Sequence, residues 1–303
     1  MREGQAPYLA WVTAVIPGAR AVAVAAVLAT ATLSVAAIVP AARANETAHV
    51  EQDPQFHAAA TAPAAVEIAS TPLSPECRCK GPAHEGAHAF RRIDQAMRER
   101  RSARVLAIGS SSTVGVGASQ PAATFTVQLE ADLERAFKGA DFDIIARGVS
   151  GEVAAGTAAR IRAEAIALKP DLIVWQVGTN DGVAHVDQAV FAALLTSTLR
   201  WLTAEHMDVV LIDPQYVGKF AADDHYKGIV RTVADVARRE RVPLVRRYLA
   251  MEDLARTQIN RSYMASDLFH LNDLGYKCMA EFAAQAIETG VRQAVAEGNL
   301  DAK

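Results

Sequence analysis

The sequence has no long run of basic residues and carries few aromatic side chains. Its 31 Lys and Arg are balanced by 34 Asp and Glu, which gives a formal net charge of -3 at pH 7. Nucleic-acid binding needs clustered Lys and Arg against the phosphates, so nucleic acid is excluded as the main partner. Aromatic residues make up only 6% of the chain, and no aromatic lining of a ligand site is evident. With 51% hydrophobic residues, the composition is that of a folded protein.

Cysteine is also scarce, because the chain has only Cys77, Cys79 and Cys278. The first two lie in PECRCKGPAHEGAH together with His84 and His88. The spacing C-x-C-x4-H-x3-H does not match the common zinc sites, so we expect no metal there. A bridge between Cys77 and Cys79 is favoured, which leaves Cys278 as a buried thiol on an apolar helix face. Pairing of either one with Cys278 stays open.

Residues 1–44 have the features of an export signal. Residues 21–39 form an uninterrupted run of Ala, Val, Leu, Ile, Ser and Thr, followed by PAARA, which ends at Ala44. This A-x-A cleavage site predicts a mature N-terminus at Asn45. The apolar run is close to the length that spans a bilayer, so an uncleaved membrane anchor is the alternative. In either case we expect the rest of the chain to be periplasmic or secreted.

Residues 45–89 predict a flexible linker or tail. They contain few large apolar side chains and much Ala, Pro, Thr, Glu and His, with no sustained period. A segment of this composition cannot bury enough apolar surface to form a core of its own. The folded part of the chain is therefore expected over residues 90–297.

Short apolar runs alternate with segments of helical periodicity from about residue 90. The expected strands are 104–108, 142–146, 171–177, 208–212 and 243–247, and the expected helices are 123–138, 154–168, 186–205, 225–240 and 273–291. Strands that are apolar at consecutive positions are covered on both faces. Alternation of strand and helix predicts a parallel sheet. The expected fold class is therefore α/β, a three-layer αβα sandwich around a five-stranded parallel sheet.

Polar residues follow these strands at the edge where functional sites of such folds lie. IGSSSTVGVG, RGVSGE and GTND follow the first three strands, and SDLFHLNDLGY precedes the last helix. Taken alone, the serine-rich stretch also fits an ordinary helix-capping turn. Together the stretches supply hydroxyl, glycine, amide, imidazole and carboxylate groups, which acyl transfer through a covalent intermediate requires.

A serine hydroxyl becomes a nucleophile only with a base within hydrogen-bond reach. His270 can be that base, and Asp267 can hold the imidazole tautomer and stabilise the imidazolium. The α/β-hydrolase elbow requires G-x-S-x-G, whereas Thr113 occupies the fifth position here. We therefore reject that arrangement.

The four stretches resemble, in this order, the four blocks of the SGNH (GDSL-type) serine esterase and acylhydrolase family, over residues 102–290. The matching residues are Gly109, Ser111, Thr113 and Gly115 in the first block, Gly151 in the second, Gly178, Thr179, Asn180 and Asp181 in the third, and Asp267 and His270 in the last. The resemblance implies a flavodoxin-like SGNH hydrolase fold. It also implies that Ser111, rather than Ser110 or Ser112, is the nucleophile of a triad with His270 and Asp267.

The oxyanion hole is expected to consist of the backbone N–H groups of Ser111 and Gly151 and the side-chain amide of Asn180. The chain departs from the family at Ser110, which replaces the Asp of the first block, and near Gly148, where many relatives have Asn. Ser110 can still accept hydrogen bonds from the turn, so we expect activity to be retained.

Asp213, Gln215 and Tyr216 follow the fourth strand at the same edge and are possible substrate-binding residues. No metal or organic cofactor is required. The expected function is that of an exported serine esterase that removes a small acyl group, acetyl above all, from a carbohydrate. The alternatives are an O-acyltransferase acting on an envelope glycan with the same triad, and a non-catalytic carbohydrate-binding SGNH domain. The expected partner is a small ester or acylated carbohydrate, with a membrane involved only if the N-terminal segment is uncleaved.

Overall fold

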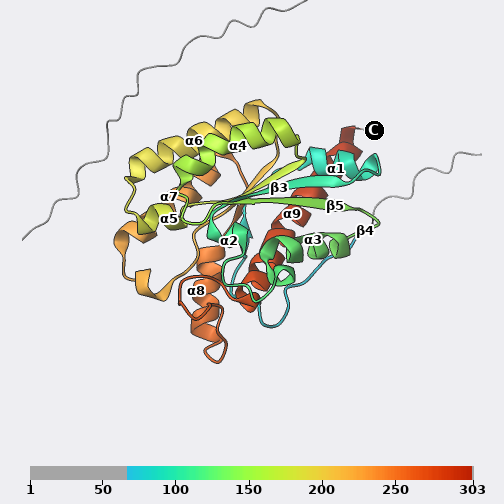
Figure 1. The fold of residues 1–303 in the computed structure, drawn as a ribbon. Coiled ribbons are helices and arrows are strands. Elements are labelled where there is room, and N and C mark those ends of the chain that lie inside the picture. Colours follow the sequence, from blue (N-terminus) through green and yellow to red (C-terminus); the bar gives the residue numbers. More distant parts are fainter. Residues whose placement is uncertain (1–66, 302–303) are drawn as a thin grey trace, which may run out of the picture. The chain divides into compact units, whose positions relative to one another are not determined.

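The computed structural model describes residues 67–301 (Figure 1). The export signal predicted over residues 1–44 and the first part of the predicted tail lie outside these residues. Within residues 67–301, no helix is both long enough and apolar enough to cross a membrane.

A six-stranded sheet forms the centre of this part of the chain, in the order β2-β8-β7-β6-β3-β5. The strands are β2 His84–Glu85, β3 Ala103–Gly109, β5 Phe142–Gly148, β6 Leu172–Gln176, β7 Val209–Ile212 and β8 Leu244–Val245. Five of them pair in parallel, as predicted, and β2 adds an antiparallel edge to β8. The prediction of five strands is therefore wrong by this one. A two-residue strand of sequence His-Glu has no apolar pattern that would reveal it.

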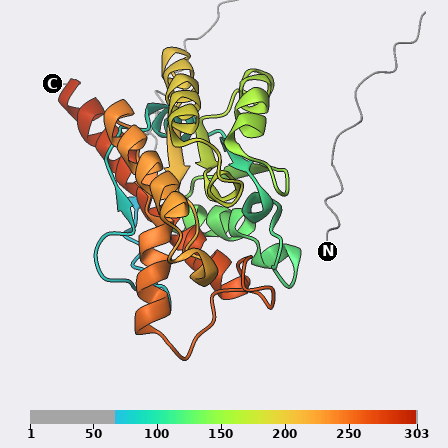
Figure 2. The ribbon, with the colours of Figure 1, turned by 90° about the vertical axis from the view of Figure 1, so that its left-hand side faces the viewer.

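Helices cover the sheet on both faces, which explains the consecutive apolar residues of its strands. Leu106 and Ile108 pack with α4, α6 and α7, whereas Val105 and Ala107 pack into a second cluster with α1, α3, α8 and α9. Figures 1 and 2 show α4 and α6 on one side of the sheet and α3 and α9 on the other. The bounds are α1 Arg91–Arg98, α3 Phe125–Ala136, α4 Ala154–Leu168, α6 Gln188–Ala204, α7 Asp224–Glu240, α8 Arg247–Thr257 and α9 Asp273–Asp301.

The remaining elements are short and lie mainly in the connections. They are β1 Glu67–Ile68, α2 Ser111–Val114, η1 Pro121–Ala123, β4 Phe137–Lys138, α5 Thr179–Val183 and η2 Gly218–Phe220. The helices α2 and α5 directly follow β3 and β6, so their first residues lie at the carboxyl edge of the sheet.

The main error in the predicted helices concerns α8. This helix was not predicted. The strand predicted over 243–247 is only Leu244–Val245 in the structure, because α8 begins at Arg247. The short helix α1 was not predicted either. The predicted helix over 154–168 is confirmed as α4.

Residues 67–89, here called the N-terminal strap, are packed against the domain, contrary to the flexible tail predicted over residues 45–89. Its first strand, β1, pairs with β4, and its last, β2, pairs with β8 of the main sheet. Between them, the Thr71 hydroxyl donates to the Glu288 carboxylate of α9 at 3.0 Å. The strap therefore obtains its order from contacts with distant segments rather than from a core of its own.

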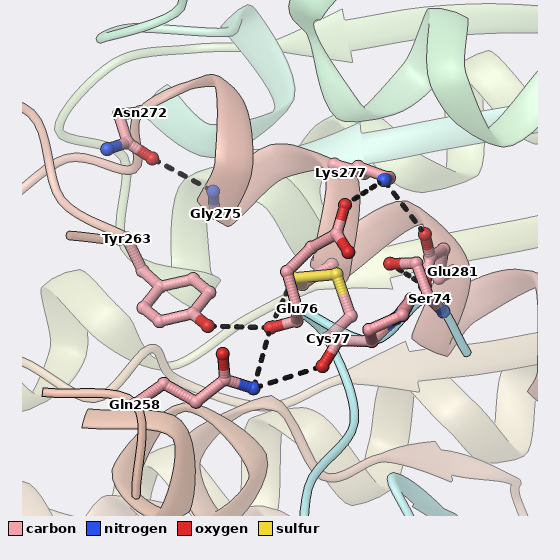
Figure 3. Close-up of a disulfide and its surroundings, with 11 residues drawn as sticks. Ser74, Glu76, Cys77, Gln258, Tyr263, Asn272, Gly275, Lys277 and Glu281 are labelled. Carbon is pink, nitrogen blue, oxygen red and sulfur yellow. Dashed lines mark hydrogen bonds and ion pairs between the residues drawn. A yellow bond between two sulfur atoms is a disulfide. The ribbon is translucent and has the colours of Figure 1, made fainter. Parts of the chain in front are cut away.

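A disulfide joins the strap to α9, between Cys77 and Cys278, whose Cα atoms lie 5.0 Å apart (Figure 3). The favoured pairing of Cys77 with Cys79 is therefore wrong, and Cys79 is the free cysteine. The error follows from the supposed tail, because nothing in the sequence showed that the strap crosses α9. Beside the disulfide, Tyr263 donates to the backbone carbonyl of Glu76 at 2.6 Å.

Loss of the disulfide is expected to destabilise the fold. The bridge closes a loop over a sequence separation of 201 residues. Cys278→Ser should lower the free energy of unfolding by about 2–5 kcal/mol, because the unfolded chain regains conformational freedom. Denaturant unfolding under oxidising conditions measures this, with Cys79→Ser as the matched control. Equal stability of the two variants would contradict the bridge.

Candidate active site

The turn that carries the three serines fits tightly against the neighbouring strands. A Cβ atom at Gly109 would lie 2.7 Å from the Gln176 carbonyl oxygen and 2.7 Å from Thr113 Oγ1. At Gly148 it would lie 2.5 Å from the Val114 backbone nitrogen. Both positions therefore require glycine. Because glycine has no side chain, the turn can pack directly against the ends of β6 and β5.

Gln176 holds Ser110, which stands where the first block of the SGNH family has Asp. The backbone N–H and the hydroxyl of Ser110 both donate to Gln176 Oε1 at 3.0 Å, and both residues are buried. The Ser110 hydroxyl thus donates to a neighbouring strand, whereas we had expected it to accept hydrogen bonds from the turn. The sequence analysis missed Gln176, although a lone polar residue in the apolar run LIVWQV was the available signal.

Ser111 is the first residue of α2 and is 7% exposed. On the other side of the site, His270 Nδ1 lies 2.5 Å from Asp267 Oδ2. Asp267 Oδ1 accepts the backbone N–H groups of Phe269 and His270, each at 2.9 Å. The Asp267 carboxylate therefore fixes both the imidazole ring and the backbone of His270.

The pKa of the Asp267 carboxyl is lowered to about 2, first by the hydrogen bond with His270 and then by the two backbone bonds. Asp267 thus remains a carboxylate at any pH near neutrality. A proton held on Nδ1 leaves the lone pair on Nε2 of His270 free to accept the proton of a nucleophile.

The loop that carries His270 lies against the loop that follows α2. A Cβ atom at Gly117 would clash with the Leu271 carbonyl oxygen and lie 3.1 Å from His270 Cβ. Ser119 donates its backbone N–H and its hydroxyl to the Asp273 carboxylate, at 2.7 and 2.5 Å. Within the described residues no hydrogen bond joins Ser111 to His270. Such bonds are often long in unliganded enzymes and shorten with substrate.

Two of the three expected oxyanion residues, Gly151 and Asn180, lie in segments that are hydrogen-bonded to each other, the loop after β5 and helix α5. Gly151 has φ +78°, a left-handed conformation that suits glycine, and no atom lies within 4 Å of the position of an added Cβ. Asn180 Nδ2 donates to the Glu152 carbonyl at 2.8 Å. The Asp181 carboxylate accepts the Ala154 backbone N–H at 3.0 and 3.1 Å. The third block thus fixes the loop that presents Gly151.

The three possible substrate-binding residues lie deeper than expected. Asp213 is fully buried and accepts the Tyr248 backbone N–H at 2.8 Å, and burial raises the pKa of its carboxyl to about 7. Gln215 is 1% exposed. Tyr216 is half-buried, with its ring edge-on to Tyr248 at 5.5 Å between centroids. Only Tyr216 therefore retains an exposed part.

Aromatic side chains gather beside the histidine, although the low aromatic content gave no sign of them. The Phe269 ring lies edge-on to His270, with centroids 4.9 Å apart, and Phe220 lies 6.4 Å from Phe269. Lys219 Nζ lies 4.9 Å from the centre of the Phe269 ring. One side of the histidine thus offers apolar ring surface and a positive charge.

No cluster of three or more His, Cys, Asp or Glu side chains is placed to hold a metal ion within residues 67–301. Of the four potential metal ligands considered in the strap, Cys77 forms the disulfide and has no thiolate to offer a metal ion.

No curated protein matches the sequence. Solved structures share the fold at low identity. A two-domain esterase (CEX) active on acetylated mannans, crystallised with mannopentaose, has a TM-score of 0.59 at 19% identity over 72% of this chain and 58% of its own. TesA has a TM-score of 0.53 at 23% identity over 61% of this chain and 97% of its own. The acetyl xylan esterase AlAXEase has a TM-score of 0.52 at 21% identity over 61% of this chain and 99% of its own.

This chain thus spans somewhat more than half of the two-domain esterase and nearly all of the two smaller proteins. These likenesses support the α/β fold with a mostly parallel central sheet. The sequence itself matches a family over residues 76–293, which include the disulfide, the serine turn and the Asp267–His270 pair. The chain belongs to the Non-GDSL lipase-like family.

Proposed function

We propose that the protein is an exported serine esterase that hydrolyses a small acyl ester, acetyl above all, on a carbohydrate through an acyl-Ser111 intermediate. The observation that carries the proposal is the Asp267–His270 pair, docked through Gly117 against the loop that follows α2, the helix that begins at Ser111. This arrangement supplies a nucleophile, a base and an orienting carboxylate at one edge of the sheet.

In the first half of the reaction, Ser111 Oγ attacks the ester carbonyl carbon while His270 Nε2 takes the hydroxyl proton. Asp267 stabilises the imidazolium that forms. The tetrahedral intermediate then expels the alcohol, which receives the proton from His270. In the second half, His270 takes a proton from water, the resulting hydroxide attacks the acyl-serine, and the acid leaves as Ser111 regains its proton.

The negative charge on the carbonyl oxygen requires fixed donors. The backbone N–H groups of Ser111 and Gly151 are two of them. An Asn side chain has two N–H bonds. In Asn180, one is used by the Glu152 carbonyl, which leaves the other for the oxyanion. The bond to Glu152 would also hold Gly151 in register with Asn180.

Several observations support the choice of substrate and compartment. Two of the proteins with a similar fold are an esterase active on acetylated mannans and an acetyl xylan esterase. Phe269, Phe220 and Lys219 beside His270 provide a surface on which the C–H face and hydroxyl groups of a sugar can lie. The export signal predicted over residues 1–44 and the Cys77–Cys278 disulfide both fit an oxidising compartment.

Ester chain length and acceptor sugars together test the proposed reaction. Rates on p-nitrophenyl esters should be highest for acetate and fall with longer acyl chains. Added sugars should leave the yield of free acetate unchanged, because water attacks the acyl-serine. Transfer of acetyl to the added sugar would instead show an O-acyltransferase, and absence of turnover on any ester would contradict the proposal.

Replacement of the nucleophile should abolish turnover. Ser111→Ala is expected to lower kcat by about four orders of magnitude, since removal of a triad member leaves only binding and the oxyanion donors. Ser110→Ala and Ser112→Ala serve as matched controls and should cost far less. Steady-state kinetics of the three variants decide the assignment, and a control with a loss as large as that of Ser111→Ala would overturn it.

Asn180→Ala tests the oxyanion site. We expect kcat to fall by about 10² to 10³, with KM nearly unchanged, because the donor acts mainly on the transition state. If Asn180 only fixed the loop through Glu152, the variant would lose thermal stability and keep its kcat. Measurement of kcat and melting temperature on the same preparation distinguishes the two roles.

A further inference from the structure

Arg247 is fully buried, yet it forms no direct hydrogen bond to a carboxylate within the described residues. Its Nε donates to the Asp213 carbonyl at 3.0 Å. One terminal nitrogen donates to the Ser112 hydroxyl at 3.2 Å, and the other donates to the Thr179 hydroxyl at 3.3 Å. A planar guanidinium offers donors in a rigid fork, so this one side chain fixes the relative positions of three segments, which are the loop after β7, α2 and α5.

Gln215 extends this set of bonds to the loop of His270. Its Oε1 accepts the Ser112 hydroxyl at 3.4 Å, and its side-chain nitrogen donates to the Phe269 carbonyl. Its backbone N–H also donates to the Thr179 hydroxyl at 3.4 Å. Both polar atoms of the Gln215 amide are thus occupied by protein groups, and the residue is buried.

These hydrogen bonds form one network, made up of Arg247, Ser112, Gln215 and Thr179. The network reaches the candidate site residues through residues that are adjacent to them in the sequence. Ser112 follows Ser111, and Thr179 precedes Asn180. The third contact, Phe269, precedes His270. Because Ser112 has one hydroxyl proton and gives it to Gln215, its oxygen is held facing inward. This orientation separates Ser112 from Ser111, whose hydroxyl is not part of the network.

We propose that Gln215 and Arg247 are positioning residues that set the separation of the Ser111 hydroxyl, the His270 imidazole and the Asn180 amide. The inference rests on the proposed esterase function. A core contact would contribute to stability alone. A link that joins α2, α5 and the loop of His270 directly behind the reacting groups acts on kcat, because small displacements of such groups slow the reaction without preventing substrate binding.

The test is Gln215→Leu, which replaces the amide by an apolar side chain of similar size and removes both side-chain bonds. We expect kcat on p-nitrophenyl acetate to fall by about 10- to 10²-fold, with KM changed less than about twofold. The matched control is Gln285→Leu, since the Gln285 amide likewise donates to a backbone carbonyl of another segment, that of Thr71, at 3.1 Å. This control should keep its kcat.

A double-variant cycle with Ser112→Ala shows whether the two residues act through one network. Ser112→Ala alone should reduce kcat, far less than Ser111→Ala does, and the double variant should lose less than the product of the two single effects. Thr198→Val, which removes a buried hydroxyl from α6, is the control for this member. If Gln215→Leu does not fold, the pair Ser112→Ala and Thr198→Val carries the same comparison.

An unchanged kcat in Gln215→Leu, or equal losses in Gln215→Leu and Gln285→Leu, would overturn the positioning role while the esterase function stands. Equal kcat values in Ser112→Ala and Thr198→Val would do the same. A wild-type protein without esterase activity, or a Ser111→Ala variant that retains it, would instead overturn the proposed function and this inference with it.

Discussion

Parallel pairing of β8, β7, β6, β3 and β5 is the constraint on which the site depends. Strands that run in one direction end at one edge, so the segments that leave β3, β5 and β6 meet there. The serine turn, the Gly151 loop and the start of α5 are brought together in this way. A parallel sheet in turn requires cover on both faces, which the two clusters of helix side chains provide.

The histidine is the exception, because it reaches the site from the loop before α9 and not from a strand end. Its position depends on contacts between segments far apart in the sequence. The strap is tied to α9 by the Cys77–Cys278 disulfide, and its Glu76 carbonyl accepts the Tyr263 hydroxyl. The Tyr263 carbonyl in turn accepts the Asn272 backbone N–H, two residues beyond His270, at 3.2 Å. The part of the strap at Glu76 and Cys77 is therefore linked, through Tyr263 and α9, to the loop that carries His270, although no strap residue lies among the proposed reacting groups.

Patterns of local sequence predicted the parallel strands and the loops of the site, because apolar runs and block spacing are local properties. The Asp267–His270 contact was predictable for the same reason, since Asp267 caps its own turn. Pairing of Cys77 with Cys278 depends on a contact between the two ends of the domain, and no local pattern reports it. The buried polar side chains behind the site were missed for the same reason. In the sequence Arg247 resembles a surface residue, and only the folded chain brings acceptors such as the Ser112 hydroxyl within reach of its guanidinium.

The central claim is that Ser111, activated by His270, forms a covalent bond with the acyl group. A fluorophosphonate reacts with the hydroxyl that an adjacent base activates, and digestion with mass spectrometry locates the modified residue. The account predicts stoichiometric labelling of Ser111 in the wild-type protein and greatly slowed labelling in His270→Ala. Modification of Ser110 or Ser112 instead, or labelling of Ser111 at an unchanged rate without the histidine, would contradict it.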